Sequence, residues 1–286
     1  MQAAGFSPNR RTALGLIGTA LALPAAALPA ALPVQAQEPR LRPRLDVPYV
    51  PTPQEVVDRM LDMAKVTGND FVMDLGCGDG RMLVTAAKKF GTAGFGVDIN
   101  PERILEANEN AKTAGVADKV TFEVRNLFDT PIGKASVLTM YLLPDVNLKL
   151  RPRILQEMKP GSRIVSHAFM MGDWEPDQRG QVGVRDFYFW VVPAPIEGKW
   201  TVREGNDNYT LDLKQKYQTF DGLATVNGAA AKVTGGQLIG DRIRFTLEPA
   251  DGRHRIFLGK VDGDAMRFDM AAATDVAREW SATRTK

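Results

Sequence analysis

The sequence predicts a doubly wound α/β domain with a mostly parallel sheet, followed by an antiparallel all-β module. Two observations predict this arrangement. Between residues 71 and 168, apolar strands alternate with helical patterns, which is typical of a parallel sheet covered by helices on both faces. Beyond about residue 196, short alternating strands are separated by Asn-Gly, Gly-Gly and Asp-Gly turns, which are typical of antiparallel hairpins.

The first 36 residues have the features of an export signal. Arg10 and Arg11 precede an alanine- and leucine-rich stretch that ends in Val34-Gln35-Ala36. This pattern is typical of a twin-arginine signal, and we expect cleavage after Ala36 and a periplasmic protein. Prolines interrupt the stretch and no apolar run reaches about 18 residues, which argues against a permanent transmembrane helix. An uncleaved membrane anchor is therefore kept only as the alternative. Residues 37–48 are rich in Pro and Arg and read as a linker.

Local patterns predict each element of the α/β domain, which we place at residues 49–195. Residues 54–64 carry the apolar stripe of an amphipathic helix. Asn100-Pro101-Glu102 opens another helix, because Asn caps, Pro suits the first turn and Glu favours the positive end of the helix dipole. The predicted order is helix 54–64, strand 71–75, helix 80–90, strand 94–98, helix 101–114, strand 120–124, strand 135–141, helix 145–158 and strand 162–168. Residues 185–192 are expected to close the sheet as an antiparallel strand.

The all-β module occupies residues 196–286. Its expected strands lie at 200–203, 209–213, 224–226, 242–247, 255–258 and 265–268. Such spacing predicts a small antiparallel barrel or a curved sheet. The module shows no catalytic constellation, and His254 is expected in solvent or at the edge of the core. We expect the module to stabilise the protein or to bind a partner.

The most informative stretch is Asp74-Leu-Gly-Cys-Gly-Asp-Gly80, which lies between a strand and a helix. Its glycines let the backbone turn sharply and approach a ligand, and Cys77 is the small residue inside the loop. The third glycine falls one position earlier than in the dinucleotide fingerprint. The carboxylates of Asp74 and Asp79 would repel a pyrophosphate. They suit a ligand that carries an ammonium and a sulfonium, which points to S-adenosylmethionine.

Two further polar residues follow the next two strands. Asp98 lies about 20 residues beyond the glycine loop, where an acid accepts hydrogen bonds from a ribose. Asn126 follows strand 120–124 and is placed to bind an adenine amino group, with Leu127 and Phe128 beside the ring. Three ligand-facing turns in order predict one cofactor site. An α/β domain without a nucleotide is the alternative.

Composition argues against several other kinds of site. The net charge is +2 and no basic run is interleaved with aromatic residues, so a nucleic-acid surface is not indicated. Cys77 is the only cysteine, which excludes an intramolecular disulfide and a multi-cysteine metal site. His167 and His254 lie far apart in sequence, and we expect no metal.

With the glycine loop, Asp98 and Asn126 in this order, residues 48–192 resemble the class I, seven-strand S-adenosylmethionine-dependent methyltransferases. Tyr49-Val-Pro-Thr-Pro53 and Tyr141-Leu-Leu-Pro144 narrow the resemblance to protein-lysine methyltransferases that act on ATP synthase and adenine nucleotide carrier subunits. The resemblance implies a Rossmann-like methyltransferase fold and a seven-strand sheet. It also implies a cofactor whose methionine end is lined by Asp74, Gly76, Cys77, Gly78 and Gly80, and over which Tyr49 and Thr52 fold.

Tyr141 and His167 are the candidate residues for the methyl acceptor. Tyr141 ends the strand after which many methyltransferases carry a polar motif, and this chain lacks the Asn-Pro-Pro-aromatic motif of DNA and glutamine methylation. We expect the Tyr141 hydroxyl to orient an amine and His167 to take a proton. A core tyrosine and a core histidine are the alternatives.

These features predict an exported methyltransferase that transfers a methyl group by in-line displacement to a nitrogen, such as that of a protein lysine. Alignment and desolvation would supply most of the acceleration, because the transferred carbon is already activated. Two alternatives remain: a small-molecule methyltransferase, and a non-catalytic protein that binds an adenosine-like ligand or an envelope partner. The second is motivated by the lack of a cofactor supply outside the cytoplasm. No transmembrane helix is expected after signal cleavage.

Overall fold

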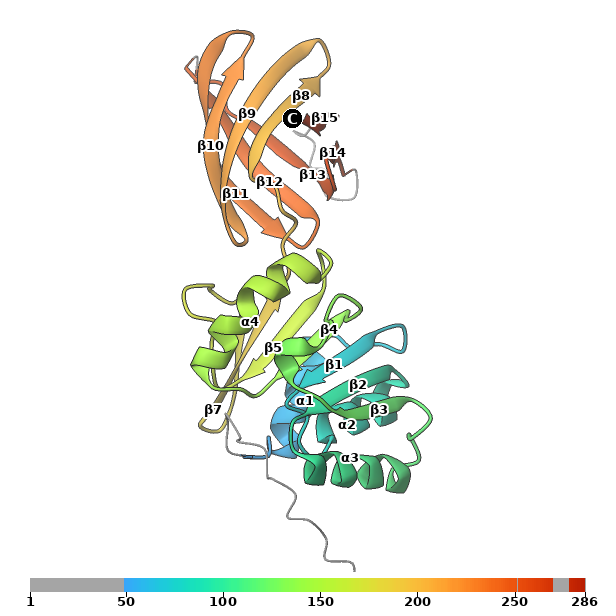
Figure 1. The fold of residues 1–286 in the computed structure, drawn as a ribbon. Coiled ribbons are helices and arrows are strands. Elements are labelled where there is room, and N and C mark those ends of the chain that lie inside the picture. The colour runs from blue at the N-terminus through green and yellow to red at the C-terminus, as the bar shows by residue number, and fades with distance from the viewer. Residues whose placement is uncertain (1–48, 251, 270–277, 286) are drawn as a thin grey trace, which may run out of the picture. The chain divides into compact units, whose positions relative to one another are not determined.

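The computed structural model describes residues 49–250, 252–269 and 278–285. This part of the chain contains an open mixed sheet with helices and a closed antiparallel barrel (Figure 1). The predicted export signal at 1–36 and the predicted linker at 37–48 both lie outside the described residues, so export stays a prediction. No helix in the described ranges has both the length and the apolar character needed to cross a membrane.

The sheet has seven strands in the order β3-β2-β1-β4-β5-β7-β6. Strands β1 to β5 are parallel, and β7 pairs antiparallel with β5. The bounds are β1 (Phe71–Leu75), β2 (Ala93–Asp98), β3 (Val120–Val124), β4 (Val137–Met140), β5 (Arg163–His167), β6 (Gln178–Val182) and β7 (Arg185–Val191). The predicted doubly wound sheet and the antiparallel pairing of residues 185–191 are confirmed, but β7 does not close the sheet, because β6 pairs with its other side. Strand β6 was not predicted, because it is an edge strand with polar, mostly exposed residues.

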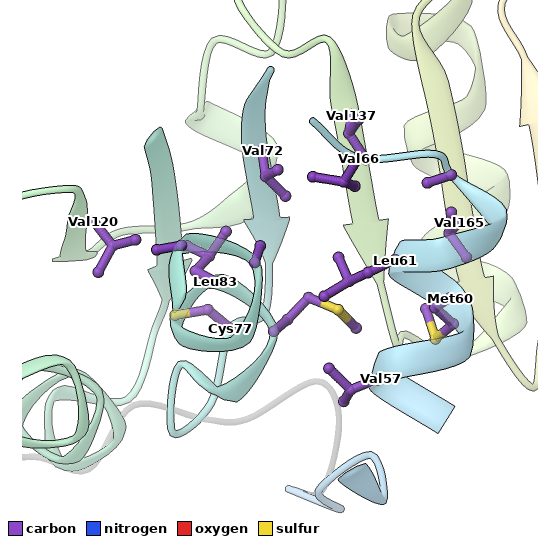
Figure 2. Packing of buried hydrophobic residues seen from close by; sticks show 14 of the residues in the cluster. Val57, Met60, Leu61, Val66, Val72, Cys77, Leu83, Val120, Val137 and Val165 are labelled. Carbon is purple, nitrogen blue, oxygen red and sulfur yellow. The ribbon is translucent and has the colours of Figure 1, made fainter. Parts of the chain in front are cut away.

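The helices of this domain are α1 (Gln54–Met63), α2 (Arg81–Phe90), α3 (Pro101–Thr113) and α4 (Pro144–Glu157), with a short 3₁₀ turn η1 at Leu127–Asp129. Asn100 caps α3 as predicted, since its side chain accepts the backbone N–H of Glu102 at 2.9 Å. Figure 2 shows Val57 and Leu61 of α1 in the same packed cluster as Val137 of β4 and Val165 of β5. The predicted apolar stripe therefore packs against the sheet.

Successive residues along a strand of the sheet pack into different hydrophobic clusters, one on each face. Val72 of β1 lies in the cluster with α1, α2 and α3, whereas Met73 lies in the cluster with Leu150 and Ile154 of α4. Helices therefore cover both faces of the sheet, and the strands are buried on each side. The carboxyl ends of the five parallel strands lie at one edge of the sheet, where such folds bind ligands.

The C-terminal module is a closed barrel of eight strands, in which the last strand pairs with the first. The strands are β8 (Gly198–Glu204), β9 (Asp207–Lys216), β10 (Thr219–Val226), β11 (Ala229–Ile239), β12 (Arg242–Pro249), β13 (Arg255–Asp262), β14 (Ala265–Phe268) and β15 (Ser281–Arg284). Stacked rings of Phe245 and Phe257, 4.7 Å apart, help to fill its interior. His254 is exposed, as expected. Strand β11 was not predicted because it begins with three alanines and contains a glycine pair at an irregular register.

Candidate active site

A cavity of about 300 Å³ lies at the carboxyl ends of the parallel strands. Residues that follow β1, β2, β3, β4 and β5 all contribute to its walls, together with the segment before α1. Its lining includes most of the residues predicted from the sequence: Tyr49, Thr52, Asp74, Gly76, Cys77, Gly78, Asp98, Asn126, Leu127 and Tyr141. Gly80 and His167 do not line it.

The glycine loop has the backbone conformation that its sequence requires. Gly76, Gly78 and Gly80 have φ angles of 77°, 52° and 76°. Residues other than glycine rarely adopt positive φ angles of this kind. A Cβ at Gly78 would lie 2.4 Å from Cε2 of Tyr49, so this glycine makes room for the tyrosine that covers it. Gly80 precedes α2, and a Cβ there would meet the ring of Phe122 at 2.7 Å. Since Phe122 lies in β3 and the added Cβ would also meet Ala107 of α3, Gly80 serves the packing of the loop against β3 and α3 rather than the cavity wall.

Three carboxylates surround the loop. Asp74 is buried and accepts a hydrogen bond from the Thr139 hydroxyl at 2.8 Å. Burial raises the pKa of Asp74 to about 7, and the charges of Asp98 and Asp79 add to the effect. Burial alone would also raise the pKa of Asp79, but its hydrogen bonds to Arg81 outweigh this and lower it. A buried acid in the company of two others favours a cationic ligand, because a positive charge stabilises its ionised form.

Asp98 holds the glycine loop at Gly78. Its Oδ2 accepts the backbone N–H of Gly78 at 3.0 Å, and its Oδ1 accepts that of Asn100 at 2.9 Å. Each carboxylate oxygen keeps a free acceptor direction, so the ribose assignment is compatible with these bonds. Asn126 is exposed, and its Oδ1 accepts the N–H of Phe128 at 2.9 Å, which caps η1. Leu127 reaches the cavity beside it, whereas Phe128 does not line it.

The segment before α1 lies over the glycine loop. Arg81 Nη1 donates to the backbone carbonyl of Thr52 at 2.9 Å, and the guanidinium of Arg103 lies 4.6 Å from the ring centroid of Tyr49. These contacts place Tyr49 and Thr52 at the cavity, where the resemblance expected them. Arg81 and Arg103 were not predicted as site residues, although both occupy the first turn of a helix that follows a ligand-facing loop.

The opposite end of the cavity is aromatic and apolar. Tyr141 and Phe169 both line it, with ring centroids 6.2 Å apart, and Leu142 and Leu143 complete this end. Sheet order separates the two ends: Asp98 and Asn126 follow β2 and β3, whereas Tyr141 and Phe169 follow β4 and β5 on the other side of β1. Phe169 was missed, and its only signal in the sequence was its place two residues beyond a strand.

His167 lies behind this aromatic end. Its ring centroid is 4.0 Å from that of Tyr141, and its Nδ1 is 3.1 Å from the Thr52 hydroxyl. Burial, helped by the positive charge of Arg185, lowers the pKa of His167 to about 4. The imidazole is thus neutral and a weak base at neutral pH. These contacts suit a residue that holds Thr52 and Tyr141 in place better than one that takes a proton.

The donor set fits S-adenosylmethionine. Asp74 and its neighbouring acids suit the ammonium and the sulfonium, Asp98 suits the ribose and Leu127 suits a base ring. A Cβ at Gly76 would meet Leu142 at 3.0 Å and one at Gly78 would meet Tyr49, so the loop is a cradle that side chains would fill.

Comparisons with known proteins agree with this assignment. The family model for the ANTKMT methyltransferase domain matches residues 74–178. A protein-lysine N-methyltransferase of Saccharolobus islandicus is 50% identical over 133 residues, which is 46% of this chain and 83% of the relative. A lysine N-methyltransferase of Xenopus laevis that is named for ATP synthase is 28% identical over 204 residues, which is 71% of this chain and 81% of the relative.

Among solved structures, an RNA methyltransferase from Salinibacter ruber in complex with S-adenosylhomocysteine is 47% identical. The match covers 51% of this chain and 96% of that protein, with a TM-score of 0.51. A cradle of glycines and acids, an aromatic end of the cavity and these relatives lead to one conclusion. The chain belongs to the S-adenosylmethionine-dependent protein-lysine methyltransferase family.

Proposed function

We propose that this protein transfers a methyl group from S-adenosylmethionine to the ε-amine of a lysine in a protein acceptor. The observation that carries the proposal is the two-ended cavity, with a glycine and carboxylate cradle at one end and Tyr141 and Phe169 at the other. A lysine side chain suits the second end, because its aliphatic stem is apolar and its amine must lose a proton. Relatives named for protein lysine support the same class of acceptor.

The chain contributes binding and alignment to this reaction. When bound, S-adenosylmethionine supplies a methyl carbon activated by the sulfonium. Asp74 and Asp98 hold the cofactor from the carboxyl ends of β1 and β2, which fixes the direction in which an amine must approach. Leu142, Leu143 and Phe169 exclude water from the path of the amine. Desolvation of this kind lowers the pKa of a lysine ammonium and favours the neutral nucleophile.

Tyr141 and His167 have different parts in this scheme. The Tyr141 ring forms a wall of the acceptor end and its hydroxyl is proposed to orient the amine. His167 supports that ring and the Thr52 hydroxyl without adding a positive charge beside the sulfonium. Neutrality at this position matters because the substrate amine is itself cationic before it loses its proton.

An RNA acceptor is the second candidate, since a similar solved structure is named an RNA methyltransferase. The charges at the cavity disfavour it. Its three lining arginines each pair with a carboxylate: Arg81 with Asp79, Arg103 with Glu106 and Arg125 with Glu123. Such pairing offsets the positive charge of each guanidinium and so weakens its attraction for phosphate.

The test is a transfer assay with S-adenosylmethionine that carries a radiolabelled methyl group. Acceptors are an array of peptides with one lysine each, the same peptides with arginine in its place, and structured RNA. Label in the lysine peptides that hydrolyses to methyllysine supports the proposal. Label in RNA alone would replace it with the second candidate. Tight binding of the cofactor without transfer to any acceptor would favour a non-catalytic binding protein.

A further inference from the structure

The segment that follows β5, residues 168–175, is named here the acceptor-side loop. It carries Phe169 to the cavity and begins at Ala168, whose φ angle is 64°. A residue with a side chain adopts this conformation only where its surroundings hold it there. The Ala168 N–H donates to the carbonyl of Asp186 at 2.8 Å, but most of the support for the loop comes from two other parts of the chain.

Helix α4 supplies the first support. Asn147, which is fully buried, donates from Nδ2 to the carbonyls of Phe169 and Met170 at 3.3 and 3.4 Å. One turn further along the helix, Arg151 donates to the Met171 carbonyl at 2.8 Å and to Asp173 at 2.7 Å. These bonds fix the backbone of the loop on the side of the sheet domain.

The barrel supplies the second support, from the two-residue turn between β9 and β10. The Tyr217 hydroxyl donates to Asp173 at 2.8 Å. Gln218 donates to the Glu175 carbonyl at 2.7 Å and accepts the indole N–H of Trp174 at 2.8 Å. Trp174 is fully buried, and its ring stacks on Tyr217 with centroids 5.6 Å apart.

The turn itself carries a residue that its conformation disfavours. Tyr217 has a φ angle of 54°, and two-residue hairpin turns with positive φ strongly prefer glycine or asparagine. Four contacts of the tyrosine side chain offset this backbone strain. The hydroxyl bonds to Asp173, and the ring stacks on Trp174. The ring centroid also lies 5.3 Å from the guanidinium of Arg151, and the ring packs against the core of the sheet domain. An observed outlier of this kind points to a role for the side chain.

We propose that Tyr217 and Gln218 of the barrel are positioning residues for the methyl acceptor. They hold the acceptor-side loop, and with it the Phe169 wall of the cavity, against α4. This inference rests on the proposed function for its acceptor, and it gives the barrel a part in the reaction. The barrel then acts as more than the stabilising or partner-binding module expected from the sequence.

The experiment compares full-length variants that remove single contacts. Tyr217→Phe deletes the hydroxyl and keeps the ring, and Tyr217→Ala removes both. Gln218→Ala removes the two hydrogen bonds that the side-chain amide makes with Glu175 and Trp174. Thr201→Val is the matched control, because it deletes an exposed hydroxyl of the same barrel, which lies 3.2 Å from the hydroxyl of Thr285. Measurements are the affinity for S-adenosylmethionine, kcat and KM for the best lysine peptide, and amide hydrogen exchange of residues 169–175.

We expect Tyr217→Ala and Gln218→Ala to lower kcat/KM for the peptide by about tenfold or more, because small displacements at a reacting pair are costly. Cofactor affinity should stay within about twofold, since the cradle is built on other strands. Exchange should rise in residues 169–175 and not in the glycine loop. The phenylalanine variant should lie between the alanine variant and the unaltered protein, and the control should match the unaltered protein.

Two results would overturn the inference: exchange in the loop that does not change, or peptide kinetics that fall only in proportion to cofactor affinity. If the unaltered protein methylates no lysine peptide, the proposed function fails on its own. The exchange measurement still decides whether the barrel holds the loop, because it needs no acceptor.

Discussion

The hydroxyl of Thr52 lies 3.1 Å from Nδ1 of His167, across 115 positions of sequence. The bond joins the segment before α1 to the end of β5, so it connects the cover of the cofactor cradle with the support of the acceptor end. Since Tyr141 packs on the same imidazole, the segment that covers the glycine loop and the aromatic end of the cavity share one buried group.

Protonation of His167 should destabilise the protein. Its pKa in the folded protein is about 4, below the ordinary value of 6.5, so the unfolded chain binds the proton more tightly. The stabilising contribution is therefore present above about pH 6.5 and is lost as the pH falls toward 4, by up to about 3 kcal/mol. Urea unfolding at several pH values should show that the free energy of unfolding falls less steeply between about pH 6.5 and 4 for His167→Gln than for the unaltered protein. Parallel pH profiles would contradict this account.

Cofactor affinity should increase as the pH rises through 7. Asp74 has its pKa raised to about 7 by burial, so it is largely protonated below that pH and ionised above it. A cationic ligand binds the ionised form, and affinity should change by up to about tenfold per pH unit on the acidic side. Calorimetry from about pH 6 to 8 would measure this dependence, and the Asp74→Asn variant should bind weakly with no such slope. An equal slope in the variant would assign the titration to another group.

Replacement of Asp98 should abolish cofactor binding while unfolding stays cooperative. The Asp98→Ala variant loses the proposed ribose acceptor and leaves the N–H groups of Gly78 and Asn100 without their partner, at a cost of about 1–3 kcal/mol. Titration with S-adenosylmethionine and a thermal melt measure the two effects separately. Unchanged affinity would overturn the ribose assignment.

Addition of a methyl group at Gly78 should displace Tyr49. The new Cβ would lie 2.4 Å from the ring, so Gly78→Ala is expected to lose cofactor affinity and about 1–3 kcal/mol of stability. Gly115→Ala is the matched control, because Gly115 also has a positive φ of 70° but has no atom within 4 Å of the added group. A second substitution, Tyr49→Ala, should recover part of the stability lost at position 78. Equal losses at positions 78 and 115 would show that backbone strain alone is responsible.

Export should depend on the paired arginines. In a twin-arginine host, Arg10→Lys combined with Arg11→Lys is expected to keep the protein in the cytoplasm at its uncleaved length. Cell fractionation and mass spectrometry of the N-terminus would measure the location and the cleavage position. Export of the double variant at the normal rate would contradict the predicted route.

Most of the sheet domain was predictable because its strands are apolar and its turns carry specific chemistry. The succession of helices and strands along the chain, the cap at Asn100 and the glycine cradle all follow from local patterns. Strand β6 was not predicted because an exposed edge strand needs no apolar alternation. Strand β11 was not predicted because its alanines and glycines have a low β-propensity, for which pairing within the barrel compensates.

The acceptor end of the cavity was less predictable because its residues act through distant contacts. Phe169 shows no motif, and Tyr217 reads as an ordinary turn residue until its bond to Asp173 is seen. The environment of His167 likewise depends on burial by several elements, which no local pattern encodes. Sequence alone therefore left two roles open for His167, a base and a core histidine, and the contacts of its imidazole with Tyr141 and Thr52 favour the second.

Closure of the barrel determines the order in which the two parts of the protein can fold during synthesis. Strand β15 is the last strand of the barrel along the chain and pairs with β8, the first, so the ring is completed only after every intervening strand has been synthesised. The seven strands of the sheet all precede β8 and can pair on a shorter nascent chain. A ribosome-stalled chain that stops before β15 would therefore present a finished cofactor cradle beside two open strand edges, which makes it a substrate for chaperones.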